Sequence, residues 1–121
     1  MLCRIDLGQM LPEVHLFHSC KKANKFLRGI GVDCEVDAGM DASTTYLRNG
    51  SRLLAVVVIR AKSDRVSEES LLVHEAVHVV METIDALGFD PRDQEVVAYM
   101  VQSVAYGLIR AHTACTSRAQ G

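Results

Sequence analysis

The chain has 121 residues, of which 49% are hydrophobic, and a formal net charge of −2 at pH 7 with histidine neutral; this length suits a single domain with a substantial core. The small charge and the absence of any run of five like charges argue against a nucleic-acid partner and against polybasic attachment to a membrane. No apolar stretch approaches the ~18 residues of a membrane span, and the first residues lack the basic and apolar segments of a secretory signal, so we expect a cytoplasmic protein.

The first third of the chain predicts a strand, a helix and a second strand. We expect a short strand in residues 1–7 and a helix in residues 12–27, which ends near Gly29 and Gly31. The apolar positions of that helix include Val14, Phe17, Phe26 and Leu27. Residues 32–37 alternate apolar with acidic side chains, a pattern typical of a half-exposed strand.

Three side chains on or beside this predicted helix are of types that bind metals, namely His15, His18 and Cys20. Their spacing matches no strong zinc pattern. We therefore interpret them as structural residues. The four cysteines of the chain include no Cys-x-x-Cys pair, so in a reducing compartment we expect most of them to be thiols; the alternative is a disulfide pair in an extracellular protein.

The middle of the chain predicts a β-hairpin. Residues 44–48 and 52–59 flank Asn49-Gly50, a dipeptide that favours a type I′ turn. Residues 53–59 are continuously apolar, which indicates a strand that is covered on both faces or central in a small sheet. A loop of residues 61–66 then leads into the next helix.

A metal-binding motif lies within that next helix. Ser67 is a good N-cap, and Gly88 suits the position that follows the last helical residue. The segment from His74 to His78 reads His-Glu-Ala-Val-His, or HExxH, and its spacing places both imidazoles on one helical face, where they can bind one metal ion. A broad apolar arc on the helix consists of Leu72, Val73, Ala76, Val77, Val79, Val80, Ile84 and Leu87.

Zinc suits the chemistry of this motif. Neutral imidazole is a favoured zinc ligand, and a catalytic zinc site takes three protein ligands and leaves the fourth position to water. Glu75 is placed beside that water rather than on the metal, so it is the candidate general base for attack on a carbonyl group. The alternative without metal binding is a helix with two half-buried histidines and a surface glutamate.

A second helix offers a third ligand. Asp90 is its predicted N-cap, Pro91 fits its first turn, and Glu95 stands in its second turn, 17 residues after His78. A polar and aromatic seam at helical spacing consists of Glu95, Tyr99, Gln102 and Tyr106. We predict that Glu95 is the third zinc ligand; the alternative is that the seam is simply the solvent-exposed face of the helix.

Residues 67–113 resemble the zincin metallopeptidases, specifically the gluzincins, in which the HExxH helix is followed by a helix that carries a glutamate ligand. The segment from Glu95 to Tyr99 also resembles that of very short zincin-like proteins of bacteria and their phages. The resemblance implies a zinc-dependent hydrolysis of peptide bonds, with His74 and His78 as further ligands.

The resemblance further implies an α+β fold in which a small antiparallel or mixed β-sheet packs against the HExxH helix and the glutamate-bearing helix. In these families an extended peptide pairs with an edge strand, and residues 44–59 are the candidates to supply that edge. The chain is short for a peptidase, so its peptide or protein substrate lies in an open groove, or a second copy or another protein completes the cleft.

Some parts of the family pattern have no clear counterpart here. Tyr99 replaces an aspartate that supports the first histidine in thermolysin-like enzymes. Candidates for the donor that stabilises the oxyanion are Tyr46, Tyr99, Tyr106 and His112. Candidates for a carboxylate behind the zinc-binding histidines are Glu82, Asp85 and Asp93.

Two other functions remain open from sequence. One is a zinc-binding interaction module, phage-encoded or prophage-encoded, that uses the same ligands without turnover. The other is a helical assembly protein without metal, whose interface would contain Met81, Met100, Tyr99 and Tyr106.

Overall fold

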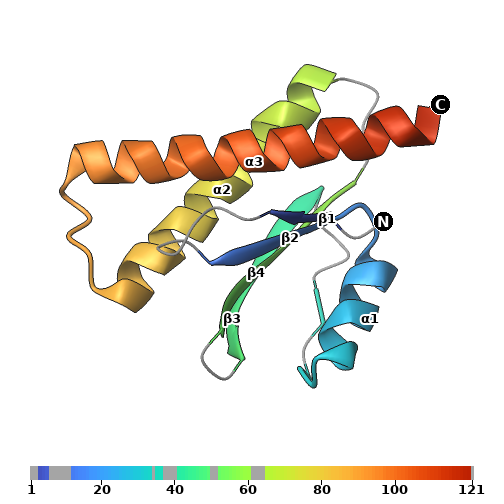
Figure 1. Cartoon of the computed structure of the whole chain (residues 1–121), viewed down its shortest axis with the longest axis horizontal. Coiled ribbons are helices and arrows are strands. Elements are labelled where there is room, and N and C mark those ends of the chain that lie inside the picture. The colour runs from blue at the N-terminus through green and yellow to red at the C-terminus, as the bar shows by residue number, and fades with distance from the viewer. Residues whose placement is uncertain are drawn as a thin grey trace.

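Seven elements form the fold of the computed structural model, which describes residues 3–5, 12–33, 35–36, 41–49, 52–60 and 65–120 (Figure 1). The strands are β1 (Cys3–Ile5), β2 (Glu13–Phe17), β3 (Ala42–Asn49) and β4 (Arg52–Ile59). The helices are α1 (Cys20–Gly29), α2 (Arg65–Leu87) and α3 (Gln94–Gln120). The fold is therefore α+β, as the resemblance implied, with a mixed sheet packed against the two long helices α2 and α3.

The strands form one sheet in the order β1, β2, β4, β3. The central pair, β2 and β4, is parallel, whereas the two outer pairs are antiparallel. β3 and β4 pair from Ala42 with Ile59 to Asn49 with Arg52, which confirms the predicted hairpin. The turn itself, and with it the predicted type I′ geometry, lies outside the described residues. β4 lies between two strands and is buried from residue 54 to residue 59, so the prediction of a central strand is confirmed.

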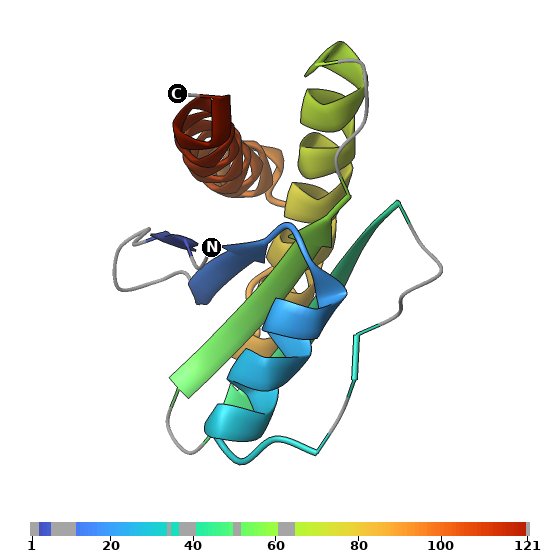
Figure 2. The same cartoon turned by 90° about the vertical axis from the view of Figure 1, so that its right-hand side faces the viewer.

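Different helices cover the two faces of the sheet, with α1 on one face and both α2 and α3 on the other (Figure 2). The larger core contains Val14, Leu16, Ala55, Val57 and Ile59 from the sheet, Leu72, Ala76, Val79, Val80 and Ile84 from α2, and Met100, Val104 and Leu108 from α3. The smaller core, under α1, contains Phe17, Ala23, Leu27, Val36, Val56 and Val58. Successive residues of β2 and β4 enter opposite cores because side chains alternate along a strand.

The prediction of a helix in residues 12–27 is wrong for its first half. Residues 13–17 form β2, and α1 begins at Cys20, where the Ser19 hydroxyl caps the helix by accepting the Lys22 backbone N–H at 3.3 Å. Val14 and Phe17 have helical spacing in the sequence, but they enter opposite cores. A strand that is buried on both faces lacks the polar alternation that would distinguish it from a helix.

The predicted strand in residues 32–37 is also wrong for residues 32, 33, 35 and 36, which form no strand; residues 34 and 37 lie outside the description. Gly31 turns the chain after α1 with a positive φ of 80°. The backbone N–H of Val36 then donates to the Asn24 side chain at 2.9 Å, and Val36 is buried under α1. Contact with a helix therefore replaces the expected strand pairing.

The ends of the long helices differ partly from prediction. α2 begins at Arg65, so Ser67 lies inside the helix and is not its N-cap. Its end is as predicted: Gly88 has a positive φ of 73°, and the Phe89 N–H donates to the Ile84 carbonyl at 3.1 Å, which is the bonding of a Schellman motif.

The apolar arc predicted for α2 is only partly buried. Val73, Val77 and Leu87 of the arc are exposed.

The start of α3 lies later in the chain than predicted. Asp93, not Asp90, is the N-cap, because its carboxylate accepts the Val96 N–H at 3.2 Å. The Asp90 carboxylate instead accepts the Arg92 backbone N–H at 2.9 Å in the preceding turn. Glu95 consequently stands in the first turn of α3, not the second.

Two further predictions can be compared with the structure. Within the described part of the chain, no helix is both long and apolar enough to cross a membrane. Cys20 is a thiol, as expected of most of the cysteines, whereas Cys115 is disulfide-bonded, as in the alternative that the sequence left open.

Candidate metal centre

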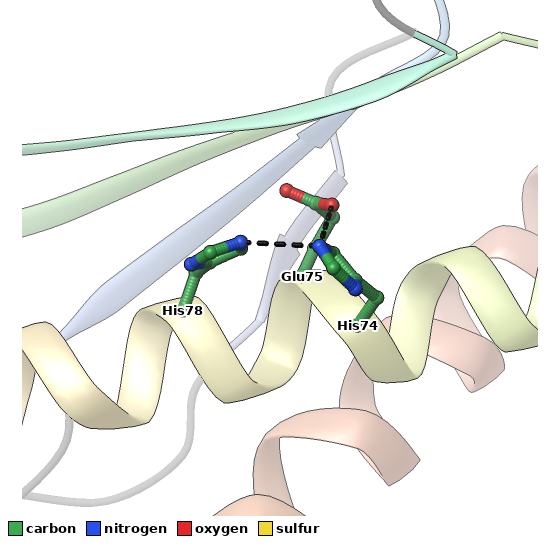
Figure 3. Close-up of side chains that lie close together, drawn as sticks. All are labelled: His74, Glu75 and His78. Carbon is green, nitrogen blue, oxygen red and sulfur yellow. Dashed lines mark hydrogen bonds and ion pairs between the residues drawn. The ribbon is translucent and has the colours of Figure 1, made fainter.

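Helix α2 brings the three polar residues of its motif together beside the sheet (Figure 3). The imidazoles of His74 and His78 turn toward each other, with 3.2 Å between their Nε2 atoms. Glu75 Oε2 lies 4.0 Å from His74 Nε2. The candidate ligand atoms of all three residues lie within 4.8 Å of one another. Among the described residues this is the one group of three or more such side chains close enough to hold a metal ion.

The spacing of the two histidines fits a tetrahedral metal. A Zn–N bond of ~2.05 Å and a tetrahedral angle separate two bound nitrogens by about 3.3 Å. The 3.2 Å between the Nε2 atoms of His74 and His78 is close to that value. Both imidazoles are exposed, so they can bind and release an ion without disturbing the core.

Glu75 differs from its neighbours in its environment. Its side chain is only 5% exposed, whereas that of His74 is 67% exposed. The hydroxyl of Thr44, on β3, donates a hydrogen bond of 2.8 Å to Glu75 Oε1. A buried carboxylate needs such a donor, because an unpaired charge away from water is costly. One oxygen of Glu75 is thus held by the sheet, and Oε2 is left on the side of the histidines.

The cluster lies in a cavity of about 420 Å³ between α2 and β3. Its walls are formed by Ala42, Ser43, Thr44 and Tyr46 of β3 and by His74, Glu75, His78 and Glu82 of α2. β3 is an edge strand, so its outer side has no partner strand in the described sheet. The cavity therefore combines potential metal ligands, a buried carboxylate and a strand edge.

Glu95 lies outside this group. It is exposed in the first turn of α3, and it is neither part of the three-residue cluster nor among the residues that line the cavity. The rest of the predicted seam on α3 is also exposed, with Tyr99 at 70% and Tyr106 at 65%. Its role as third ligand stays a prediction.

The three candidate supporting carboxylates occupy different places. Glu82 lines the same cavity as the histidines. Asp85 lines a separate cavity of about 250 Å³ near the end of α2, and Asp93 caps α3. Glu82 is therefore the one of the three that shares a cavity with the motif.

A second polar group lies outside the cavity and ties α2 and α3 to the end of β2. Glu68 Oε1 lies 2.7 Å from His112 Nε2, and His112 Nδ1 lies 2.7 Å from His18 Nε2. Glu68 and His112 are buried, at 8% and 4% exposed. Burial, followed by the neighbouring His112, lowers the pKa of His18 below its ordinary value. This network agrees with the structural interpretation of His18 and gives His112 a structural role as well.

No protein-family model, curated protein or solved structure matches this chain. The function is therefore inferred from the geometry of α2 and β3. That geometry shows a cluster of His74, Glu75 and His78 that could hold a metal ion.

Proposed function

We propose that this protein is a zinc-dependent metallopeptidase. The observation that carries the proposal is the division of roles within the motif: two exposed imidazoles stand at the spacing of a tetrahedral metal site, and the glutamate between them is buried and held by Thr44. A carboxylate that is fixed beside a metal site, with one oxygen toward the histidines, suits a general base.

The residues of the cavity divide the chemistry among them. His74 and His78 would hold zinc, with Glu95 as the predicted third ligand. Zinc in this place would supply a Lewis acid and lower the pKa of a coordinated water towards ~7. Glu75 would accept the proton of the attacking water at Oε2 and later deliver it to the leaving amine, while Thr44 keeps Oε1 in place.

The edge of β3 supports a peptide as the substrate. An extended peptide can add to an exposed sheet edge through backbone hydrogen bonds, which bind any sequence with little discrimination. Residues of β3 line the same cavity as the motif, so a peptide paired with this strand would lie next to the metal-binding histidines and Glu75.

A second candidate function is a zinc-binding module without catalysis. One observation favours it: the cluster offers three donor groups only if Glu75 is counted as one of them, since Glu95 lies outside it. If Glu75 bound the metal, no general base would remain in the cluster, and the protein would bind zinc, with a protein partner or a second copy covering the open side.

The two functions are separated by Glu75→Gln. Zinc content is measured on protein purified without a metal-binding tag, and cleavage of an unbiased peptide library is followed by mass spectrometry. For a peptidase, Glu75→Gln keeps one zinc per chain and loses activity by a factor near the upper end of ~10² to 10⁴. Chelated wild-type protein is the control. Loss of zinc from Glu75→Gln, without cleavage by zinc-loaded wild type, would favour the binding module.

A further inference from the structure

We propose that Tyr46 is a catalytic residue of this site, whose phenolic O–H donates a hydrogen bond to the substrate carbonyl oxygen as negative charge develops on it. The inference rests on the proposed peptidase function and adds the oxyanion donor that the sequence left open. The donor keeps its proton throughout, so no bond of Tyr46 forms or breaks.

Tyr46 is placed for this role by the alternation of β3. Residues two apart on a strand share a face of the sheet, so Tyr46 lies on the same face as Thr44, which binds Glu75. Tyr46 lines the cavity together with His74, Glu75 and His78. Its body is partly buried and packs against the core shared by the sheet, α2 and α3.

The hydroxyl of Tyr46 has no hydrogen-bond partner among the described residues. Its oxygen is buried and makes no hydrogen bond, which is true of no other hydroxyl in the part of the chain that the structure describes. Buried polar groups are nearly always paired, and an orphan carries a desolvation cost that a partner would relieve. A carbonyl oxygen of a molecule bound in the cavity would be such a partner once binding opens access to this oxygen, which solvent hardly reaches in the structure. An oxyanion would accept more strongly than a neutral carbonyl.

The other candidate donors are placed elsewhere. Tyr99 and Tyr106 lie on the exposed side of α3 and do not line the cavity. His112 is buried in the network with Glu68 and His18, away from the motif. Of the four candidates that the sequence offered, Tyr46 alone shares a cavity with Glu75.

The test compares Tyr46→Phe with the matched control Tyr99→Phe, which removes an exposed hydroxyl from α3. Three quantities are measured by calorimetry and thermal unfolding: the affinity for zinc, the affinity of the zinc-loaded protein for acetohydroxamate, and the melting temperature. Acetohydroxamate is the probe because it is a small zinc ligand that presents an ionisable oxygen beside a carbonyl.

We expect Tyr46→Phe to bind zinc as tightly as wild type and to melt at the same or a higher temperature, because an orphan hydroxyl is removed. Its affinity for acetohydroxamate should fall roughly 10- to 100-fold, as for loss of a hydrogen bond to a charged group. With any peptide that the wild type cleaves, kcat should fall by a factor of ~10² to 10³ with little change in KM. Tyr99→Phe should match wild type in every measurement.

Equal acetohydroxamate affinities for wild type and Tyr46→Phe, with zinc bound in both, would overturn this inference and leave the proposed function standing. A fall in zinc affinity by the same factor would also overturn it, because Tyr46 would then support the ligands and not the bound molecule. A wild type that binds no zinc would overturn the proposed function, and this inference with it.

Discussion

The hydroxyl of Thr44 and the carboxylate of Glu75 meet at 2.8 Å across 31 residues of sequence. One belongs to the edge strand β3 and the other to the middle of α2, so the bond joins the two walls of the cavity. It is also the contact that separates Glu75 from an ordinary surface glutamate, because it gives the buried charge a donor. The orientation of the proposed general base is thus a property of the tertiary fold.

The first prediction concerns this bond. Thr44→Val removes the donor and leaves a buried carboxylate with one fewer partner, so we expect the free energy of unfolding to fall by about 1.5–3 kcal/mol. In a cleavage assay kcat should fall about tenfold or more while KM changes little, since Glu75 is no longer held. Thr44→Ser should restore both quantities. Thr45→Val, on the opposite face of β3, is the control; an equal effect from it would remove the special role of Thr44.

The second prediction concerns metal and stability. An ion that binds only the folded state stabilises it by about 3 kcal/mol at a hundredfold excess over its dissociation constant. A chelator should therefore lower the melting temperature of zinc-loaded wild type and leave His74→Ala unchanged. Val73→Ala, at an exposed neighbouring position of α2, should respond like wild type. Identical chelator responses in wild type and His74→Ala would contradict a site built on this helix.

The third prediction concerns the third ligand. If Glu95 completes the site when zinc is present, Glu95→Ala should weaken zinc binding substantially, and Gln102→Ala on the same exposed seam should not. Competition with a coloured zinc indicator measures both affinities. Should Glu95→Ala bind zinc as tightly as wild type, the third ligand lies elsewhere, and Glu82→Ala becomes the next variant because Glu82 lines the cavity.

The fourth prediction concerns pH. Burial lowers the pKa of His18 in the folded protein below its ordinary value of 6.5, so on acidification the unfolded chain takes up this proton before the folded chain does. The stability is therefore complete above about pH 6.5 and is lost as the pH falls through the lowered pKa. The charged groups that act on His18 are His112, Glu68, Lys22 and the N-terminal amino group.

The measurement is urea unfolding between pH 5 and 8 in the presence of a chelator, which keeps metal binding out of the comparison. His18→Gln should show a shallower loss of stability below pH 6.5 than wild type does. Gln102→Ala, which changes an exposed side chain of α3 that does not titrate, should keep the wild-type slope. A His18→Gln slope equal to that of wild type would show that this histidine does not control the acid response.

Much of the fold could be predicted because its signals are local. The hairpin of β3 and β4 follows from two β-rich segments around a turn, and the end of α2 follows from Gly88, which adopts the positive φ that glycine tolerates. β2 could not be recognised, since both of its faces are buried and its apolar residues imitate helical spacing. Its strand character comes from pairing with β4, which is distant in the sequence.

For the candidate site, the residues that lie on one helix could be predicted from the sequence, and their contacts with other elements could not. The spacing of His74 and His78 on one helix fixes their proximity, and the structure brings their Nε2 atoms together. Thr44 was missed because a threonine on a strand carries no signal for its partner on another element. Tyr46 was one of four equal candidates until the fold placed it beside Glu75 in one cavity. What could not be predicted from the sequence is which side chains of different elements come together.

The parallel pairing of β2 with β4 has a consequence for the order of folding. The β3–β4 hairpin and the α2–α3 pair join neighbouring segments, whereas β2 must reach β4 across a long stretch of chain, from Glu13 to Leu54. Long-range pairing is slow because the loop entropy is lost before the contacts are gained. We therefore expect pulse-labelled amide exchange to protect β2 last. Both walls of the cavity come from residues 42–87, so its halves can meet while the sheet still lacks its parallel strand.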